Sequence, residues 1–231
     1  MLLFTLITFL SATLAASHQH LSRQIDDPID ASRTPWSHGT HNGFHYAFFT
    51  EARGPLTYQN LDAGRYRVEW GKDCAAFTAG KGWAGRDLPS TVNYNGTWTT
   101  TDGHLGLYGW SDSPLVEFYI IENWGLYDPG QDREKMGEVE SDGSVYDVYR
   151  WRASEKAYWK YFSVRRGKRT GGRIEVTKHF DRWNELGMTM GKLEYFILAT
   201  EAVSYVETRP GWGGIWRDID GGVAEVEVWR G

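Results

Sequence analysis

Two segments rich in apolar and aromatic residues each carry a glutamate where a buried side chain is expected. Residues 114–125 read PLVEFYIIENWG, and the alternation of side chains along a strand puts Glu117 on the same face as Tyr119. A second segment, KLEYFILATEAVSY, ends a similar row of aromatic and apolar side chains with Glu201. An ionised carboxylate on an apolar surface is costly unless it is paired, hydrogen-bonded or open to a cleft. Strands also carry charge for purely structural reasons, so the pattern alone leaves both interpretations open.

If both glutamates face one cleft, the chemistry that suits them best is hydrolysis of a glycosidic bond. That reaction needs two carboxyl groups across the bond that is cleaved, one acting as nucleophile or base and the other transferring a proton. The sequence has no phosphate-binding loop, internal repeat or cysteine cluster, and we expect no metal and no cofactor.

The elements that must position these glutamates are predicted to be strands. From Gly39 onward, short runs of β-branched and aromatic residues alternate with turn signals, a spacing typical of a sandwich or closed β-roll. The predicted strands are FHYAFF, LTYQN, RYRVEW, TVNYNGTW, HLGLYGW, LVEFYII, SVYDVYRW, YWKYFSV, KLEYFILA and VAEVEVW. We therefore expect an all-β fold.

One segment, EVTKHFDRWNELGM, predicts a single short helix that lies on a sheet. Val176, Phe180 and Trp183 fall at helical spacing, so their side chains share one apolar face. Thr177 is expected to cap the first turn, and Gly187 suits the left-handed residue that ends a helix.

Composition favours one large domain. The chain has 231 residues, with 12 Trp, 13 Tyr and 27 Gly, and all-β sandwiches of this length commonly form a single unit. A formal net charge of −5 gives no general attraction to nucleic acid, so we expect no nucleic-acid partner. Cys74 is the single cysteine, which excludes an intramolecular disulfide. We expect a monomer.

The N-terminus reads as a targeting segment followed by a polar stretch. Residues 1–16, MLLFTLITFLSATLAA, have an apolar stretch too short to span a membrane and small residues at its end, which predicts a secretory signal peptide. Residues 17–35 are predicted to form a flexible arm or propeptide, and 36–231 the β domain. The protein is therefore expected to be secreted, with no membrane attachment after cleavage.

Several longer motifs resemble one known family. THNGFHYAFFTE, FTAGKGW, LYGWSDSPLVEFYIIENWGLYDP, GEVESDGSVYDVYR, SVRRGKR with HFDRW, and LEYFILATE occur in the order found in family 11 glycoside hydrolases, the secreted endo-1,4-beta-xylanases. The resemblance extends from Gly39 to about Glu201. It implies a jelly-roll sandwich of two strongly curved antiparallel sheets, with xylan lying in a concave cleft.

The resemblance also assigns roles to residues of this sequence. It implies a retaining double displacement in which Glu117 is the nucleophile and Glu201 the general acid/base. The implied substrate-binding residues are Phe49 in the second glycone subsite, Tyr108, Tyr119, Arg152 and Tyr195.

The chain departs from the family near both implied glutamates. The family residue that contacts the acid/base aligns with Ala76, which cannot donate or accept a hydrogen bond through its side chain, so the usual dependence of activity on pH does not transfer. The family's tryptophan platform is replaced by Phe49, and its sugar-binding glutamine by Lys160.

Two further departures change the rim of the cleft. The family's thumb hairpin is replaced by WRASEKA between Arg150 and Tyr158, so the thumb is predicted to be truncated or absent. An insertion at 206–220 follows the second glutamate and carries Trp212 and Trp216, which could either pack on the shell or form a new wall of the cleft.

These observations predict a secreted endo-1,4-beta-xylanase that acts on internal bonds of xylan. Two alternatives remain: a related β-glycanase of shifted specificity, and a catalytically silent carbohydrate-binding or plant-interacting protein on the same fold. Release of reducing sugars from xylan separates the first from the others.

Overall fold

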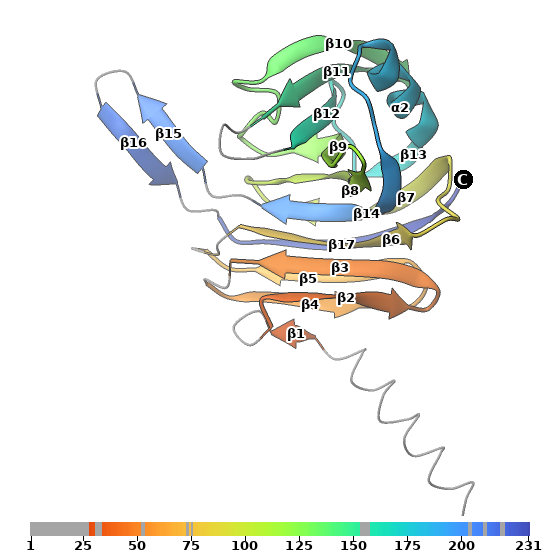
Figure 1. Ribbon diagram of the computed structural model, residues 1–231. Helices are drawn as coiled ribbons and strands as arrows, with labels where there is room; N and C mark the ends of the chain where they lie inside the picture. The colour runs from red at the N-terminus through yellow and green to blue at the C-terminus, as the bar shows by residue number, and fades with distance from the viewer. Residues whose placement is uncertain are drawn as a thin grey trace, which may run out of the picture.

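The computed structural model describes residues 28–30, 34–51, 54–72, 74, 76–152, 158–202, 205–209, 212–217 and 220–231, with backbone alone for Asp30, 205–209 and 212–217. The predicted all-β class is confirmed, because in the described part of the chain strands dominate and form two large sheets in a jelly roll, with one short helix on the outside (Figure 1). The predicted signal peptide and residues 17–27 of the predicted arm lie outside the described residues. No helix in the described part of the chain is long and apolar enough to cross a membrane.

The larger sheet has nine strands and holds both glutamates. In spatial order its strands are β10 (Glu134–Ser141), β11 (Ser144–Trp151), β12 (Trp159–Arg165), β9 (Val116–Trp124), β8 (His104–Asp112), β14 (Lys192–Ala202), β6 (Phe77–Ala84), β3 (Phe44–Thr50) and β2 (Trp36–His41). Neighbouring strands of this sheet are antiparallel, as expected, except β12 and β9, which run parallel.

The smaller sheet has six strands and covers the back of the larger one. Its order is β1 (Ile29–Asp30), β4 (Leu56–Asn60), β5 (Arg65–Trp70), β17 (Gly222–Arg230), β7 (Thr91–Thr99) and β13 (Gly171–Glu175). The predicted arm therefore contributes two residues to a strand, because Ile29 and Asp30 pair with Tyr58 and Thr57. A separate hairpin of β15 (Tyr205–Arg209) and β16 (Trp212–Arg217) projects away from both sheets in Figure 1.

The apolar residues divide into two clusters that lie on opposite faces of the large sheet. The main cluster fills the space between the two sheets and includes Val116, Phe118 and Ile120 of β9. A smaller cluster, built around Tyr119 and Ile121, lies on the other face of the same strand. Because Glu117 alternates with Val116 and Phe118, it shares the face of the smaller cluster rather than that of the main core.

The predicted helix forms, but its start differs from the prediction. Helix α2 spans Val176–Glu185, and its N-cap is Glu175, without a side-chain capping hydrogen bond, so the prediction that Thr177 caps it was wrong. Gly187 has φ of +76°, which confirms the expected left-handed stop. The buried face of the helix meets the back of β9, where the Phe180 ring lies 5.1 Å from the Phe118 ring.

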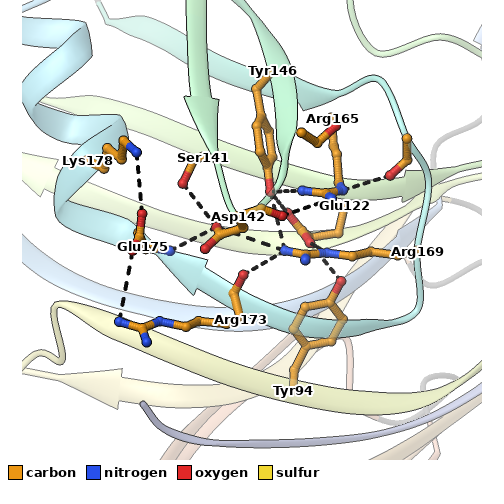
Figure 2. A network of polar contacts seen from close by, with 12 residues as sticks. Tyr94, Glu122, Ser141, Asp142, Tyr146, Arg165, Arg169, Arg173, Glu175 and Lys178 are labelled. Carbon is orange, nitrogen blue, oxygen red and sulfur yellow. Dashed lines mark hydrogen bonds and ion pairs between the residues drawn. The ribbon is translucent and has the colours of Figure 1, made fainter.

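A buried polar network fixes the far end of β9 (Figure 2). Glu122 is fully buried and accepts hydrogen bonds from Tyr94 Oη at 2.8 Å and Tyr146 Oη at 2.6 Å. Arg169 forms an ion pair with the same carboxylate, which compensates the cost of burying its charge. Because Tyr94 belongs to β7 of the small sheet, the network ties the two sheets together five residues beyond Glu117.

The buried imidazole of His179 in α2 leads us to expect that the protein loses stability in acid. Its ring lies 4.6 Å from that of Tyr146, neither ring nitrogen has a hydrogen-bond partner, and burial lowers the pKa of His179 to about 3. Between the ordinary pKa of 6.5 and 3, the unfolded chain binds a proton that the folded chain excludes. The free energy of unfolding should therefore fall by up to about 5 kcal/mol over this range because of His179 alone.

His179→Leu should flatten this acid-side slope, whatever its effect on stability at pH 7. Urea unfolding at pH 7, 5.5 and 4 measures the slope, with His38→Gln as the control at an exposed histidine. An equal slope in wild type and His179→Leu would show that other groups cause the acid sensitivity.

Candidate active site

Glu117 lies near the start of β9 and is held from two sides. Its Oε1 accepts a hydrogen bond of 2.6 Å from Tyr119 Oη, two residues along the same face. The ammonium group of Lys160 lies 2.5 Å from Oε2, because the parallel pairing of β12 and β9 places Lys160 directly beside Glu117. Only 5% of Glu117 is exposed, so the hydrogen bond and the ion pair both act in a poorly solvated environment, where such contacts are strong.

Glu201 lies near the end of β14, between β6 and β8. Thr78 is its neighbour across β6 and donates a hydrogen bond of 2.7 Å to Oε2. His104 is its neighbour across β8, with Nε2 3.7 Å from Oε1. Burial, together with the nearby charges of Arg133 and Lys160, lowers the pKa of His104 to about 3, so the imidazole is neutral above that pH.

The environment of Glu201 favours its protonated form. Only 8% of the residue is exposed, and burial raises its pKa to about 7, with the Thr78 hydrogen bond opposing the shift and the charge of Glu117 adding to it. In mildly acidic solution Glu201 therefore carries a proton, while Glu117 faces the ammonium group of Lys160. A protonated acid and a paired carboxylate that are close enough for the charge of one to act on the other are the two groups that glycoside hydrolysis needs.

Three tyrosine rings lie near the carboxyl groups of both Glu117 and Glu201. The rings of Tyr108 and Tyr119 lie 5.2 Å apart, and those of Tyr108 and Tyr195 lie 6.3 Å apart. The charges of both glutamates contribute to raising the pKa of Tyr108, Tyr119 and Tyr195, which shows that these phenols lie near both carboxyl groups. The three tyrosines named from the sequence thus come together with Glu117 and Glu201.

Two cavities open from this centre. One has a volume of about 440 Å³ and is lined by Trp36, Ser37, His38, His45, Ala47, Phe48, Phe49, Thr78, Tyr108 and Tyr195. The other has a volume of about 320 Å³ and is lined by Gly103, His104, Tyr119, Tyr127, Pro129, Gln131, Asp132, Arg133, Trp151, Lys160, Phe162 and Glu201. Phe49 and Trp36 are more than half exposed and pair across β3 and β2, so they offer adjacent ring faces to a bound sugar.

The structure does not bring Arg152 into this site. Arg152 is exposed, its guanidinium lies 5.4 Å from the Trp159 ring, and it lines neither cavity. The arginine that lines a cavity is Arg133, at the end of the connection between β9 and β10. No group of three or more His, Cys, Asp or Glu side chains within the described ranges is arranged to hold a metal ion.

The hydrogen-bonding neighbour of Glu201 on this part of the chain is Thr78, two residues after the aligned Ala76. Ala76 precedes β6, whereas the register of the sheet places Thr78 opposite Glu201. Alternation along a strand gives residues 76 and 78 the same face, and this period was the signal in the sequence that could have identified Thr78. Residues 153–157 of the WRASEKA segment that replaces the family's thumb, and the side chains of Trp212 and Trp216, lie outside the described residues.

Thr78→Val should raise the pKa of Glu201. The substitution keeps the shape of the side chain but removes the hydroxyl that now lowers the pKa of this carboxyl. We expect the basic limb of the activity profile to move to higher pH, as measured by initial rates between pH 4 and 9. Thr99→Val, at an exposed position of β7, is the control. A basic limb that stays in place would show that Glu201 does not set it.

The comparisons with known proteins agree with this geometry. A model described as glycosyl hydrolases family 11 matches residues 41–208. Endo-1,4-beta-xylanase 2 from Rhizopus oryzae is 42% identical over 171 residues, covering 71% of this chain and 78% of that protein. An ethylene-inducing xylanase from Penicillium digitatum is 40% identical with the same coverage. A solved structure from a comparison of two major endo-1,4-beta-xylanases of Trichoderma reesei is 31% identical, with a TM-score of 0.63, covering 77% of this chain and 93% of that one. The chain therefore belongs to glycosyl hydrolases family 11.

Proposed function

We propose that the protein is a secreted endo-1,4-beta-xylanase that cleaves internal bonds of xylan with retention of configuration. The observation that carries this proposal is the environment of the two glutamates, since Glu117 pairs with Lys160 while burial raises the pKa of Glu201 to about 7. The names of the relatives support xylan as the substrate. The apolar stretch and small residues of 1–16, which predict a secretory signal peptide, support secretion.

In this mechanism each glutamate has one role in each step. Glu117 attacks the anomeric carbon and forms a covalent ester with the sugar, while Glu201 gives its proton to the departing glycosidic oxygen. Glu201, now ionised, takes a proton from the water that attacks the ester, and Glu117 leaves as a carboxylate. Tyr119 donates a hydrogen bond to Glu117, and the ammonium group of Lys160 pairs with it. Both groups therefore lie beside this carboxyl group as it changes from carboxylate to ester and back.

The cavity that contains Phe49 is assigned to the glycone side of the cleaved bond, because the resemblance places Phe49 in the second glycone subsite. Phe49 and Trp36 would stack on the apolar faces of successive xylose units. The cavity that contains Arg133 then lies on the leaving-group side of the cleaved bond.

Incubation of the purified chain with linear β-1,4-xylan tests this function. We expect release of reducing ends with a rapid drop in viscosity, which marks cleavage of internal bonds, and no comparable release from mixed-linkage β-glucan. Faster release from β-glucan would favour the shifted-specificity alternative.

A second function has one observation in its favour. A relative with 40% identity is named an ethylene-inducing xylanase, so a signalling role toward plants is a candidate for this chain as well. Binding of xylan without any release of reducing ends would favour that role over catalysis.

A further inference from the structure

Arg133 is carried by a tightly folded connection between β9 and β10. Asp128 Oδ1 accepts a hydrogen bond from the Gly130 backbone N–H at 2.8 Å, and the Arg133 N–H donates to Gly130 O at 3.3 Å. A Cβ atom added at Gly130 would lie 2.6 Å from the Tyr149 ring, so the turn packs against β11 with no room for a side chain there. The loop therefore holds Arg133 in a defined place.

The guanidinium of Arg133 has no anionic partner within the protein as described. Its Cζ lies 4.1 Å from the centre of the Phe162 ring, which orients the group by a cation–π contact. No carboxylate of the described residues lies within 4.0 Å of it, and its buried Nη1 has no hydrogen-bond acceptor among them. A poorly solvated N–H without an acceptor is costly, and a ligand that supplies an acceptor would remove this cost.

The other charged groups of the same cavity do not neutralise Arg133 by direct contact. Lys160 is paired with Glu117, and His104 is neutral above its pKa of about 3. Glu201 is protonated in mildly acidic solution, since burial raises its pKa to about 7. The carboxylate of Asp132 also lines the cavity, but it is exposed to solvent. An anion that enters the cavity therefore meets an unpaired guanidinium and the ammonium group of Lys160.

The rest of the cavity suits a sugar ring. Trp151 and Tyr127 line it, and Trp151 is 37% exposed, so an aromatic face is open to an apolar sugar face. At about 320 Å³ the volume accommodates a monosaccharide.

We propose that this cavity binds a uronic acid branch of the xylan chain, with the branch carboxylate paired to Arg133 and its ring against Trp151. A guanidinium binds a carboxylate through two parallel N–H···O bonds, a geometry that the hydroxyl groups of neutral sugars do not match. This inference rests on the proposed function and narrows its substrate class to acidic xylans.

Affinity electrophoresis of the full chain at pH 5.5 and 4 °C tests the proposal without relying on turnover. The gels contain glucuronoxylan, or the same polymer after reduction of its carboxyl groups to alcohols, or polygalacturonate. We expect wild type to bind glucuronoxylan about tenfold more tightly than the reduced polymer, as befits one charge-assisted pair. Arg133→Gln should lose this preference, Arg133→Lys should keep part of it, and Arg173→Gln, at an exposed arginine far from the cavity, should keep all of it.

Three results would overturn the proposal: equal binding of glucuronoxylan and the reduced polymer by wild type, a preference that survives in Arg133→Gln, or equally tight binding of polygalacturonate, which would indicate general attraction to polyanions. Thermal unfolding of each variant separates loss of the pair from loss of the fold. Failure of the proposed xylanase function can be told apart from failure of this proposal. It would appear in a separate assay, in which the protein releases no reducing sugar from unsubstituted xylan.

Discussion

Glu117→Gln should lower kcat on xylan at least about a thousandfold, because an amide neither attacks the anomeric carbon nor carries the charge that stabilises the transition state. The substitution is nearly isosteric, and Tyr119 can still donate its hydrogen bond to the amide oxygen. Binding of xylo-oligosaccharides should therefore persist within a few fold. Initial rates of reducing-end release and calorimetric titration with xylohexaose measure the two effects.

A matched control is Glu69→Gln, at an exposed glutamate of β5 in the small sheet, which should leave kcat unchanged. Glu117→Gln also leaves the ammonium group of Lys160 without its carboxylate partner, so thermal unfolding must accompany the kinetics. A folded Glu117→Gln variant with more than a tenth of wild-type kcat would exclude Glu117 as the nucleophile.

Glu201→Gln should slow the cleavage of substrates whose leaving group must be protonated far more than that of substrates whose leaving group departs as a stable anion. On xylan, the departing sugar oxygen requires protonation, and kcat should fall about a thousandfold. On dinitrophenyl β-xylobioside the leaving group departs as a stable anion, so formation of the covalent intermediate should proceed at near the wild-type rate. Stopped-flow measurement of the dinitrophenolate burst tests this difference. An equal loss on both substrates would contradict an acid role for Glu201.

The same variant gives a stability readout that needs no substrate. Burial raises the pKa of Glu201 from 4.5 to about 7, so the folded chain holds a proton that the unfolded chain releases between these values. The contribution of Glu201 to the unfolding free energy therefore falls by on the order of 3 kcal/mol as pH rises through this window, opposing the rise that His179 causes, and Glu201→Gln should lack this fall. Urea unfolding at pH 4.5 and 7.5 measures the difference between wild type and Glu201→Gln, and the same change in both proteins would show that Glu201 titrates normally.

The strands with clear alternation could be predicted from the sequence, whereas the glycine-rich β6 could not. FTAGKGWA has no regular period of apolar side chains, yet it forms a central strand next to β14. The structure explains the glycines: a Cβ at Gly80 would lie 2.0 Å from Leu198 O, and one at Gly82 would lie 2.2 Å from Phe196 O. Such a close backbone approach is decided by the neighbouring strand, which lies more than a hundred residues away in the chain.

The candidate site was predictable where it depends on a single strand. The faces of β9 and β14 place Glu117, Tyr119, Tyr195 and Glu201 by alternation alone. Lys160 stands out as a departure from the family, but its contact with Glu117 arises from the one parallel strand pair of the large sheet, which no local pattern indicates.

The position of Arg133, like the contact between Lys160 and Glu117, could not be predicted from any local sequence pattern. Arg133 lines the cavity because the connection between β9 and β10 places its guanidinium over the Phe162 ring of β12, so its position depends on the pairing of strands that are distant in the sequence. Arg152, by contrast, follows β11 directly and was placed in the site by resemblance to the family, whereas its guanidinium lies over Trp159.

The central claim is that Glu117 forms a covalent bond to the sugar during turnover, and trapping with 2-deoxy-2-fluoro-β-xylobiosyl fluoride tests it most directly. The fluorine slows both steps, and the fluoride leaving group restores the first, so the intermediate accumulates. After proteolysis, mass spectrometry should find one fluoroxylobiosyl group on the peptide that contains residues 114–125, bound to Glu117, with activity lost in parallel. A label on any other residue, or inactivation without a covalent label, would contradict the account.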